Sequence, residues 1–221
     1  MKIYCMSDIH GCLWEFEEAL SLILEHINEP DTMLCFLGDY IHGPDGRGVL
    51  DRIMSLQDKY GEDKIVALIG NHEDFVLSGY CGIDGYDYEE NEEDEKYFNW
   101  IRTLPSYYTY GNTIFVHAGI DEEAGEDWEW GTSYEIFTAK YPASIGKIEG
   151  MDKKVVAGHI YTSIIADDYH YHDIYYDGKS HYYIDGNTLE TGIIPILLVD
   201  TDDDKYYQVK DSGNEEVKPY K

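Results

Sequence analysis

The sequence predicts a single-domain α/β fold in which two sheets pack face to face and helices flank them. Residues 2–77 alternate between strand-like and helix-like segments, whereas the chain beyond residue 110 is dominated by short strand-like runs separated by turn signals. The length also fits one domain, because 221 residues at 43% hydrophobic composition can bury a single core. No internal repeat or Ser/Gly linker divides the chain, so residues 1–221 are expected to form one domain.

The first half of the chain reads as three strand–helix pairs. The expected strands are residues 2–7, 32–37 and 64–69, and the last two are continuous apolar runs, typical of strands buried on both faces. The expected helices are residues 13–27 and 48–60, whose apolar side chains recur at helical spacing, and residues 73–77. Strands that alternate with helices in this way pair in parallel through helical crossovers.

The second half changes character. Short strands are expected at residues 113–116, 154–157, 181–184, 194–199 and 205–209. Turn signals separate them, among them Asp177-Gly178 and Asp185-Gly186-Asn187, and the acid cluster 202–204 indicates a closing hairpin. Before these strands lies an acidic insertion around residues 84–97, which we interpret as a solvated surface excursion.

The charge balance excludes several classes of partner. Lys and Arg total 16 against 45 Asp and Glu, which gives a formal net charge of −29 at pH 7. Nucleic acid and anionic membranes would repel such a chain, so we expect neither as a partner. The apolar runs are too short to span a bilayer, and the first eleven residues do not resemble a signal peptide. Four cysteines without a C-x-x-C pair fit reduced thiols, so we expect a cytoplasmic protein.

Polar motifs follow five of the expected strands. In chain order they are Ser7-Asp8-Ile9-His10-Gly11, Gly38-Asp39-Tyr40, Gly70-Asn71-His72-Glu73, Val116-His117-Ala118-Gly119 and Ala157-Gly158-His159. Each motif alone is weak evidence for a metal site, because a D-x-H after a strand, or a lone histidine, is more often structural than metal-binding. Five such motifs at the carboxyl ends of strands, each beside glycine, together predict one site at the sheet edge.

The residue types in these motifs indicate metal binding. Carboxylate, amide and imidazole ligands without thiolate suit borderline divalent ions such as manganese, iron or zinc. Six ligand residues exceed what one catalytic ion with open positions needs, but they suit two bridged ions. Two ions about 3.5–4 Å apart are the arrangement used for in-line attack on phosphorus.

The ordered set of motifs from Asp8 to His159 resembles that of the calcineurin-like metallophosphoesterases, and within them the phosphoprotein phosphatase branch. The resemblance implies a four-layer α/β/β/α sandwich and two divalent ions, with manganese preferred and iron, zinc or magnesium as alternatives. It also implies the metal ligands: Asp8 and His10 for the first ion, Asp39 as the bridge, and Asn71, His117 and His159 for the second. His72 matches the family's proton donor to the leaving oxygen, and Asp39 and His72 are therefore the expected catalytic residues. Attack would come from a metal-bridging hydroxide.

The second motif departs from the family's G-D-x-x-D-R-G. Here a single residue, His42, stands where the family has an Asp-Arg pair. In the family, that Asp orients the catalytic histidine and that Arg binds the phosphate. The sequence also lacks arginine at residues 127–132, where a second clamp would be expected. We expect His42, Asn71 and Arg47 to contact the substrate phosphate, although His42 can equally be a loop residue without chemistry.

Three functions remain open from the sequence. The first is hydrolysis of phosphomonoesters, as in serine/threonine protein phosphatases. The second is symmetrical hydrolysis of dinucleoside tetraphosphates, and the third is a metal-binding scaffold with weak or no catalysis, because the phosphate clamp is missing. The substrate would accordingly be a phosphoprotein or a small phosphoester or nucleotide. Most of the 22 tyrosines are expected to be core or surface residues rather than a stacking platform.

Overall fold

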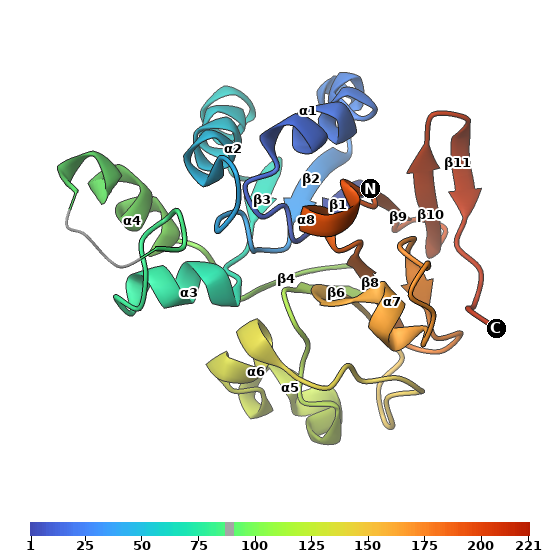
Figure 1. Cartoon of the computed structure of the whole chain (residues 1–221). Helices are drawn as coiled ribbons and strands as arrows, with labels where there is room; N and C mark the ends of the chain where they lie inside the picture. The colour runs from blue at the N-terminus through green and yellow to red at the C-terminus, as the bar shows by residue number, and fades with distance from the viewer. Residues whose placement is uncertain (87–90) are drawn as a thin grey trace.

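Two β-sheets lie at the centre of the fold, and each is covered on its outer face by helices (Figure 1). The structure, a computed structural model, describes residues 1–86 and 91–221. Helices α1 (Leu13–Ser21) and α2 (Gly46–Tyr60) cover the first sheet, and the short helices α5 (Trp128–Gly131) and α6 (Tyr134–Ala139) lie against the second. This is the expected α/β/β/α order of layers.

The first sheet has the strand order β11-β10-β9-β1-β2-β3. Its strands are β1 (Lys2–Met6), β2 (Thr32–Phe36), β3 (Ile65–Ala67), β9 (Leu197–Asp200), β10 (Lys205–Lys210) and β11 (Gly213–Glu216). Strands β1, β2 and β3 are parallel, as the alternation of strands and helices predicted, and β9 and β10 form the expected closing hairpin. Strand β9 begins later than expected, because Pro195 has no backbone N–H to donate to a neighbouring strand.

The second sheet has the order β4-β5-β6-β8-β7. Its strands are β4 (Tyr107–Tyr110), β5 (Thr113–Val116), β6 (Lys154–Tyr161), β7 (Tyr175–Tyr176) and β8 (His181–Asp185). The three central strands are parallel, so their carboxyl ends point to one edge of the sheet. The antiparallel edge strands β4 and β7 were not expected from the sequence.

The remaining helices are short and occupy the loops. They are the 3₁₀ helices η1 (Leu24–Asn28), η2 (Glu92–Asp94) and η3 (Glu122–Asp127), and the α-helices α3 (Asn71–Leu77), α4 (Glu95–Ile101), α7 (Thr162–Ile165) and α8 (Thr188–Thr191). The single helix expected over residues 13–27 is divided into α1 and η1, because Leu22 and Ile23 donate to carbonyls three residues earlier and tighten the turn. Among the described helices, none has the length and apolarity to cross a membrane.

The acidic insertion is less solvated than expected. Asp94 is buried and receives two hydrogen bonds from Arg47, and Tyr97 of α4 is buried in the core. Residues 87–90 of the insertion lie outside the described residues. The expectation of a purely solvated excursion therefore fails at its second half, where α4 packs against the protein.

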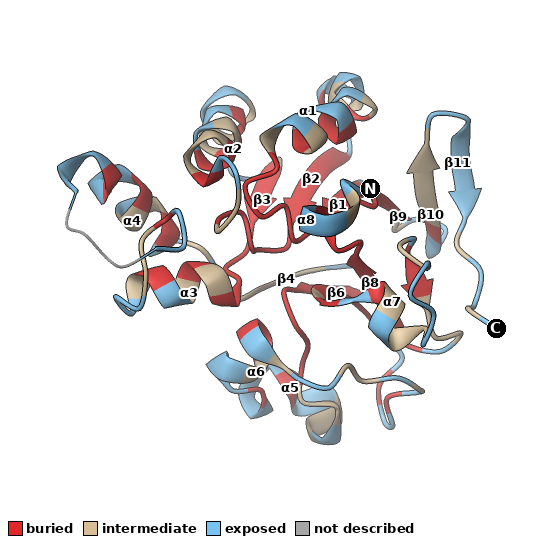
Figure 2. Ribbon diagram, in the orientation of Figure 1, coloured by how far each residue is buried: buried red, intermediate tan, exposed pale blue. Residues whose placement is uncertain are grey.

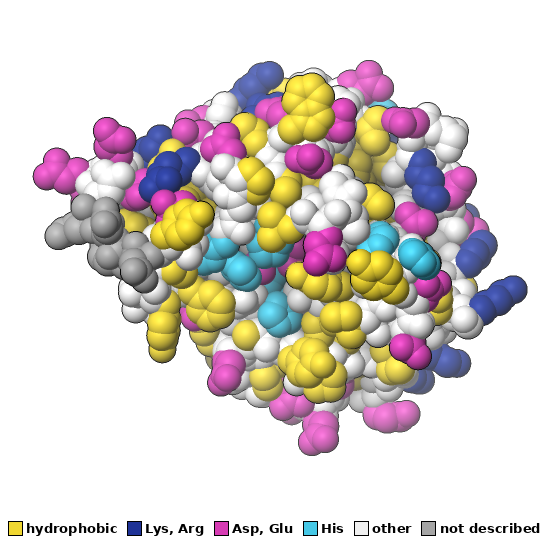
Figure 3. Space-filling model, viewed as in Figure 1, with side chains coloured by type: hydrophobic (Ala, Val, Ile, Leu, Met, Phe, Trp, Pro, Cys, Tyr) yellow, Lys and Arg dark blue, Asp and Glu magenta, His cyan; other side chains and the backbone are white. Residues whose placement is uncertain are grey.

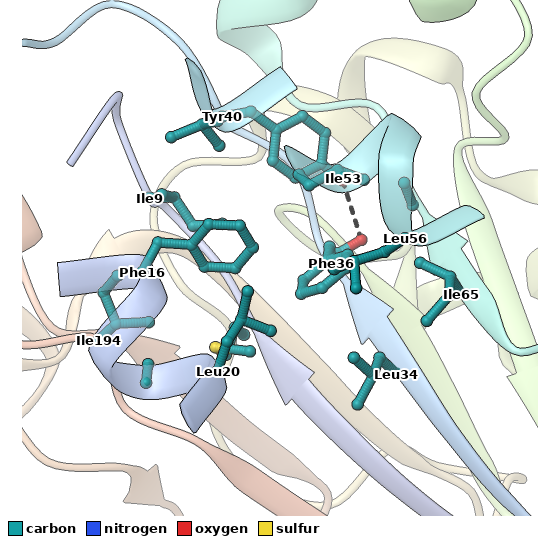
Figure 4. Close-up of a cluster of buried hydrophobic side chains, with 14 of the residues drawn as sticks. Ile9, Phe16, Leu20, Leu34, Phe36, Tyr40, Ile53, Leu56, Ile65 and Ile194 are labelled. Atoms are coloured by element: carbon teal, nitrogen blue, oxygen red, sulfur yellow. Dashed lines mark hydrogen bonds between the residues drawn. The ribbon is translucent and has the colours of Figure 1, made fainter. Parts of the chain in front are cut away.

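The core has three layers of apolar side chains, one under each set of helices and one between the sheets. The buried residues are concentrated on the central strands (Figure 2). In β1, Tyr4 and Met6 face the helices while Ile3 and Cys5 face the other sheet, so the strand is buried on both faces. In the first layer, Phe16 of α1 packs edge-on against Phe36 of β2 at a centroid distance of 5.4 Å (Figure 4).

Candidate metal centre

The strand-end motifs meet in one cleft, to which the loops of both sheets contribute. The predicted site residues that line this cleft of about 320 Å³ are Asp8, His10, Asp39, Asn71, His72 and His159. His117 is fully buried and contacts Asp39 and Asn71. Figure 3 shows histidine side chains gathered at the middle of this face, with hydrophobic side chains around them. The structure thus brings together all six residues that the resemblance assigned to metal binding.

Asp39 lies at the centre of this group. Its Oδ2 atom is 3.4 Å from Nε2 of His117 and 3.8 Å from Nε2 of both His10 and His72. Two groups with possible ligand atoms within 4.8 Å of one another share this aspartate: His10, Asp39 and His72 form one, and Asp39, His117 and His159 the other. A carboxylate common to two ligand groups is placed as a bridging ligand would be.

Asp8 and Asn71 extend the two groups. Asp8 Oδ1 is 3.9 Å from His10 Nε2, and its Oδ2 accepts a hydrogen bond of 3.0 Å from the backbone N–H of His159. Asn71 Oδ1 lies 3.0 Å from His117 Nε2. One difference from the sequence-based assignment is that His72, expected only as a proton donor, also lies within reach of the first group.

The histidines are oriented by backbone carbonyls. Nδ1 of His10 faces the carbonyl of Ile41 at 3.2 Å, and Nδ1 of His117 faces that of Leu37 at 2.9 Å. When Nδ1–H donates to these carbonyls, Nε2 is left to face Asp39 in both residues, and in a neutral ring this nitrogen carries the lone pair that a metal ion would bind. A carbonyl that fixes the tautomer in this way is usual behind metal-binding histidines.

The backbone at the ligands is unusual. Asp8, His10, Asp39 and His159 have φ angles of +54°, +47°, +57° and +66°, which place them in the left-handed region. This conformation turns the chain sharply at the end of each strand. Two neighbouring glycines are required by close approach, because a Cβ on Gly158 would lie 2.1 Å from Asp8 Oδ2 and one on Gly70 would lie 2.2 Å from Asp39 Oδ1.

Glu73, which the sequence left without a role, joins the second and third loops. Its carboxylate accepts the backbone N–H groups of Asp39 at 2.8 Å, Tyr40 at 2.8 Å and Gly70 at 3.0 Å. Burial, together with the charge of Asp39, raises the pKa of Glu73 to about 7. The hydroxyl of Tyr40 adds hydrogen bonds to the carbonyls of Phe36, drawn in Figure 4, and Leu68, which anchor the same loop in the core.

Burial dominates the electrostatics of the site. It raises the pKa of Asp8 and lowers the pKa of His72 and His159 to about 4 each. At His117 burial alone would lower the pKa, but the adjacent Asp39 outweighs it and raises the pKa to about 10. Burial likewise opposes ionisation of Asp39, yet the surrounding histidines hold its pKa below the usual range.

These residues fit two divalent cations. The carboxyl groups of Asp8, Asp39 and Asp185 are at most 2% exposed, and of the described residues that line the cleft none is lysine or arginine. His117, with its raised pKa, supplies one positive charge to these three carboxyl groups, and buried carboxylates in excess of the available positive charge are unfavourable unless a cation compensates them. Together with oxygen and imidazole donors, these carboxylates form a ligand set that manganese, iron or zinc can bind.

Asp185 is a cleft residue that sequence reasoning interpreted only as part of a turn. It ends strand β8, is 1% exposed and lines the cleft. Its Oδ1 accepts the N–H of Asn187 at 2.8 Å, whereas Oδ2 has no hydrogen-bond partner in the described part of the chain. Burial and the neighbouring Asp8 raise the pKa of this carboxyl well above its usual range. The signal that identified the other motifs, a carboxylate directly after an apolar strand, is present here too.

The structure places two of the expected phosphate-binding residues outside the cleft lining. Nδ1 of His42 lies 2.6 Å from Nδ1 of His72, and its Nε2 lies 3.0 Å from the carbonyl of Gly82, so both ring nitrogens have partners within the protein. Arg47 directs Nε and Nη2 at the two carboxylate oxygens of Asp94, at 2.8 and 2.7 Å. Asn71, the third, lines the cleft.

Comparisons with known proteins identify the family. The sequence profile of the calcineurin-like phosphoesterases matches residues 1–194. The chain is 30% identical over 128 residues to a symmetrical bis(5'-nucleosyl)-tetraphosphatase of Nitrosospira multiformis, a match that covers 54% of this chain and 44% of the relative. A protein of the same name from Wigglesworthia glossinidia brevipalpis is 33% identical over 130 residues, covering 54% and 45%. The matches thus span less than half the length of these relatives.

Two solved structures share the fold. A cold-active protein-tyrosine phosphatase of a psychrophilic Shewanella species superposes with a TM-score of 0.65 at 15% identity, over 98% of this chain and 80% of that one. A putative diadenosine tetraphosphatase superposes with a TM-score of 0.62 at 16% identity, over 94% and 92%. With the profile matched over most of its length and the motif residues gathered at one cleft, this chain belongs to the calcineurin-like phosphoesterase family.

Proposed function

We propose that the chain is a dimetal phosphohydrolase that cleaves dinucleoside polyphosphates symmetrically. The observation that carries the dimetal centre is the position of Asp39, which two ligand groups share within one cleft. The names of relatives support the substrate class, since those from Nitrosospira multiformis and Wigglesworthia glossinidia brevipalpis are symmetrical bis(5'-nucleosyl)-tetraphosphatases. The sequence alone ranked phosphomonoesters first, and the relatives favour the alternative.

In this proposal the residues have distinct roles. Asp8 and His10 would hold one ion, Asn71, His117 and His159 the other, and Asp39 both. Bound divalent ions supply an activated water for attack on phosphorus and positive charge for the phosphoryl oxygens. Glu73 keeps Asp39 in place through the backbone of its loop.

His72 would hold the proton for the leaving oxygen. Nε2 of His42 can donate to the Gly82 carbonyl, which leaves Nδ1 of His42 to accept from Nδ1–H of His72. The pair thereby directs Nε2 of His72 toward Asp39 and the cleft, at 3.8 Å from Oδ2. His42 is then a positioning residue, which takes over the orienting role of the family's aspartate but not its negative charge.

The chemistry of this pair supports an anhydride substrate. A neutral imidazole stabilises a protonated His72 less than a carboxylate would, and burial already lowers the pKa of His72 to about 4, so only a small fraction of His72 carries the proton at neutral pH. Cleavage of a phosphoanhydride releases a phosphate group, which is a much weaker base than the alkoxide released from a serine phosphate. A substrate whose leaving group needs little protonation therefore suits this site better.

A substrate panel tests the proposal. With manganese added, the chain should hydrolyse diadenosine tetraphosphate to two molecules of ADP, with higher kcat/KM than for a phosphoserine peptide. The matched control is His72→Ala, loaded with the same metal. Preference for the phosphopeptide would return the function to phosphomonoester hydrolysis, and rates equal to those of His72→Ala on every substrate would indicate a metal-binding scaffold.

A further inference from the structure

The rim of the metal cleft is apolar and aromatic. Beside the metal-binding side chains the cleft is lined by Tyr141, Ile160, Tyr161, Ile164 and Leu189. Of these, Tyr141 is 75% exposed and Ile164 is 57% exposed. Exposed apolar side chains scattered singly need no explanation, but several at the mouth of one catalytic cleft indicate contact with an apolar part of a ligand.

The same cleft offers a phosphorylated substrate no cationic side chain. Of its described lining residues none is lysine or arginine. Lys140, the neighbour of Tyr141 in the chain, directs its ammonium group at Glu122 and at the carbonyl of Ile120 instead. Metal ions would attract the reacting phosphates, but affinity for the rest of the substrate has to come from other contacts.

We propose that Tyr141 and Tyr161 form a stacking site for a nucleobase of the substrate at the mouth of the metal cleft. The inference rests on the proposed function, and it names the part of the substrate that these residues recognise. Tyr161 ends strand β6 two residues after His159, so the site is contiguous with the metal centre. A planar base fits a rim without positive charge, because stacking on an aromatic ring needs only its apolar face.

Tyr161 is 36% exposed and lines the cleft, so its ring is open to a ligand there. In this proposal the two residues bind substrate, whereas the sequence alone predicts core or surface positions for most of the tyrosines. Tyr169 provides a matched control, since it is 75% exposed like Tyr141 and is not among the described residues that line the cleft.

Equilibrium binding tests the inference independently of turnover. Dissociation constants for diadenosine tetraphosphate and for inorganic tripolyphosphate would be measured by calorimetry on manganese-loaded His72→Ala, which hydrolyses slowly. Into this background Tyr141→Ala, Tyr161→Ala, Tyr141→Phe and Tyr169→Ala are introduced. Stacking of one base on one ring corresponds to a change of about 5- to 150-fold in the dissociation constant.

We expect Tyr141→Ala and Tyr161→Ala to weaken binding of diadenosine tetraphosphate by an amount in this range and to leave tripolyphosphate binding unchanged. Tyr141→Phe, which keeps the ring, and Tyr169→Ala should bind both ligands as the parent does. Equal weakening for both ligands, or none for diadenosine tetraphosphate, would overturn the stacking site. Failure of the wild-type protein to cleave diadenosine tetraphosphate would instead overturn the proposed function, whatever the binding results.

Discussion

The two ends of strand β8 carry buried charges that are balanced in different ways. At its start, His181 lies between two carboxylates, with Nδ1 2.9 Å from Asp177 Oδ2 and Nε2 3.4 Å from Glu122 Oε1. Lys140 forms a further ion pair with Glu122. At its end, Asp185 lies in the metal cleft with Asp8 and Asp39, where the described lining residues include histidine but neither lysine nor arginine.

The way in which the buried carboxylates are compensated distinguishes the two ends of the strand: the His181 cluster is structural, and the group around Asp185 belongs to the candidate metal site. The His181 cluster contains its own cations, so its carboxylates are compensated within the chain and need nothing from solution. The carboxylates around Asp185 exceed the positive charge that the chain supplies, and an uncompensated buried charge is strongly unfavourable. Buried acidic groups in this protein therefore indicate a ligand site only where the chain lacks a matching cation.

The largest effect is expected from Asp39→Asn. Removing the charge shared by the two ligand groups should increase repulsion between two ions at short range, so both metal content and activity should fall nearly to background. Elemental analysis after gel filtration measures the metal content. The matched control is Asp177→Asn in the other cluster, which should retain the metals, and two ions retained in Asp39→Asn would contradict the bridging role.

His72→Ala should slow hydrolysis by about 10²- to 10⁴-fold, the usual contribution of proton donation. If His72 is a donor and not a ligand, both ions should remain bound, and substrates with good leaving groups should lose the least rate. Steady-state kinetics with aryl and alkyl phosphates, combined with metal analysis, distinguish the two roles. Loss of an ion from His72→Ala would assign His72 to the first ligand group instead.

His42→Ala should lower kcat by about 10- to 100-fold, because His72 loses the partner that orients it. KM and metal content should stay close to those of the wild type, since His42 does not line the cleft. The variant His42→Asp restores an acceptor for Nδ1–H of His72 and should recover rate. A raised KM with unchanged kcat would support the phosphate contact expected from the sequence.

Lys140→Met is expected to act on stability alone. It removes a partner from the mostly buried Glu122 and should destabilise the fold by about 1–3 kcal/mol. For a domain of this size, that lowers Tm by about 2–12 °C. Metal content should not change, and a loss of metal in this variant would show that the two clusters are coupled.

The smallest effect is a dependence of this stabilisation on pH. Burial opposes the charge on Glu122 and His181, but their partners outweigh it, lowering the pKa of Glu122 to about 2 and raising the pKa of His181. The contribution of Glu122 is therefore lost as pH falls from about 4.3 toward 2, and that of His181 as pH rises above about 6.5. The difference in Tm between wild type and His181→Gln should be largest between these limits, and a difference independent of pH would contradict the charged pair.

Much of the site could be predicted because its signals are local. A polar motif directly after an apolar run identifies the carboxyl end of a strand, and parallel strands bring such ends together. Asp8, Asp39 and His117 were found in this way. The parallel order of β1, β2 and β3 followed from the helices between them.

The parts that could not be predicted depend on contacts between distant segments. His42 meets His72 because two loops thirty residues apart fold against each other. Arg47 is held by Asp94 from the acidic insertion, and nothing in the local sequence of either residue indicates the pair. The edge strand β7 is only two residues long and has no periodicity to detect.

The left-handed backbone at four of the site residues also limits which amino acids these positions tolerate. The four are Asp8, His10, Asp39 and His159. Residues with a Cβ adopt this conformation at a disadvantage of about 1–2 kcal/mol, whereas Gly, Asn and Asp tolerate it best. A β-branched residue at any of these positions would harm the turn as well as the chemistry. At Asp8 and Asp39, asparagine is the substitution that removes the carboxylate while keeping the turn, so Asp→Asn at these two positions should abolish metal binding with little change in the fold.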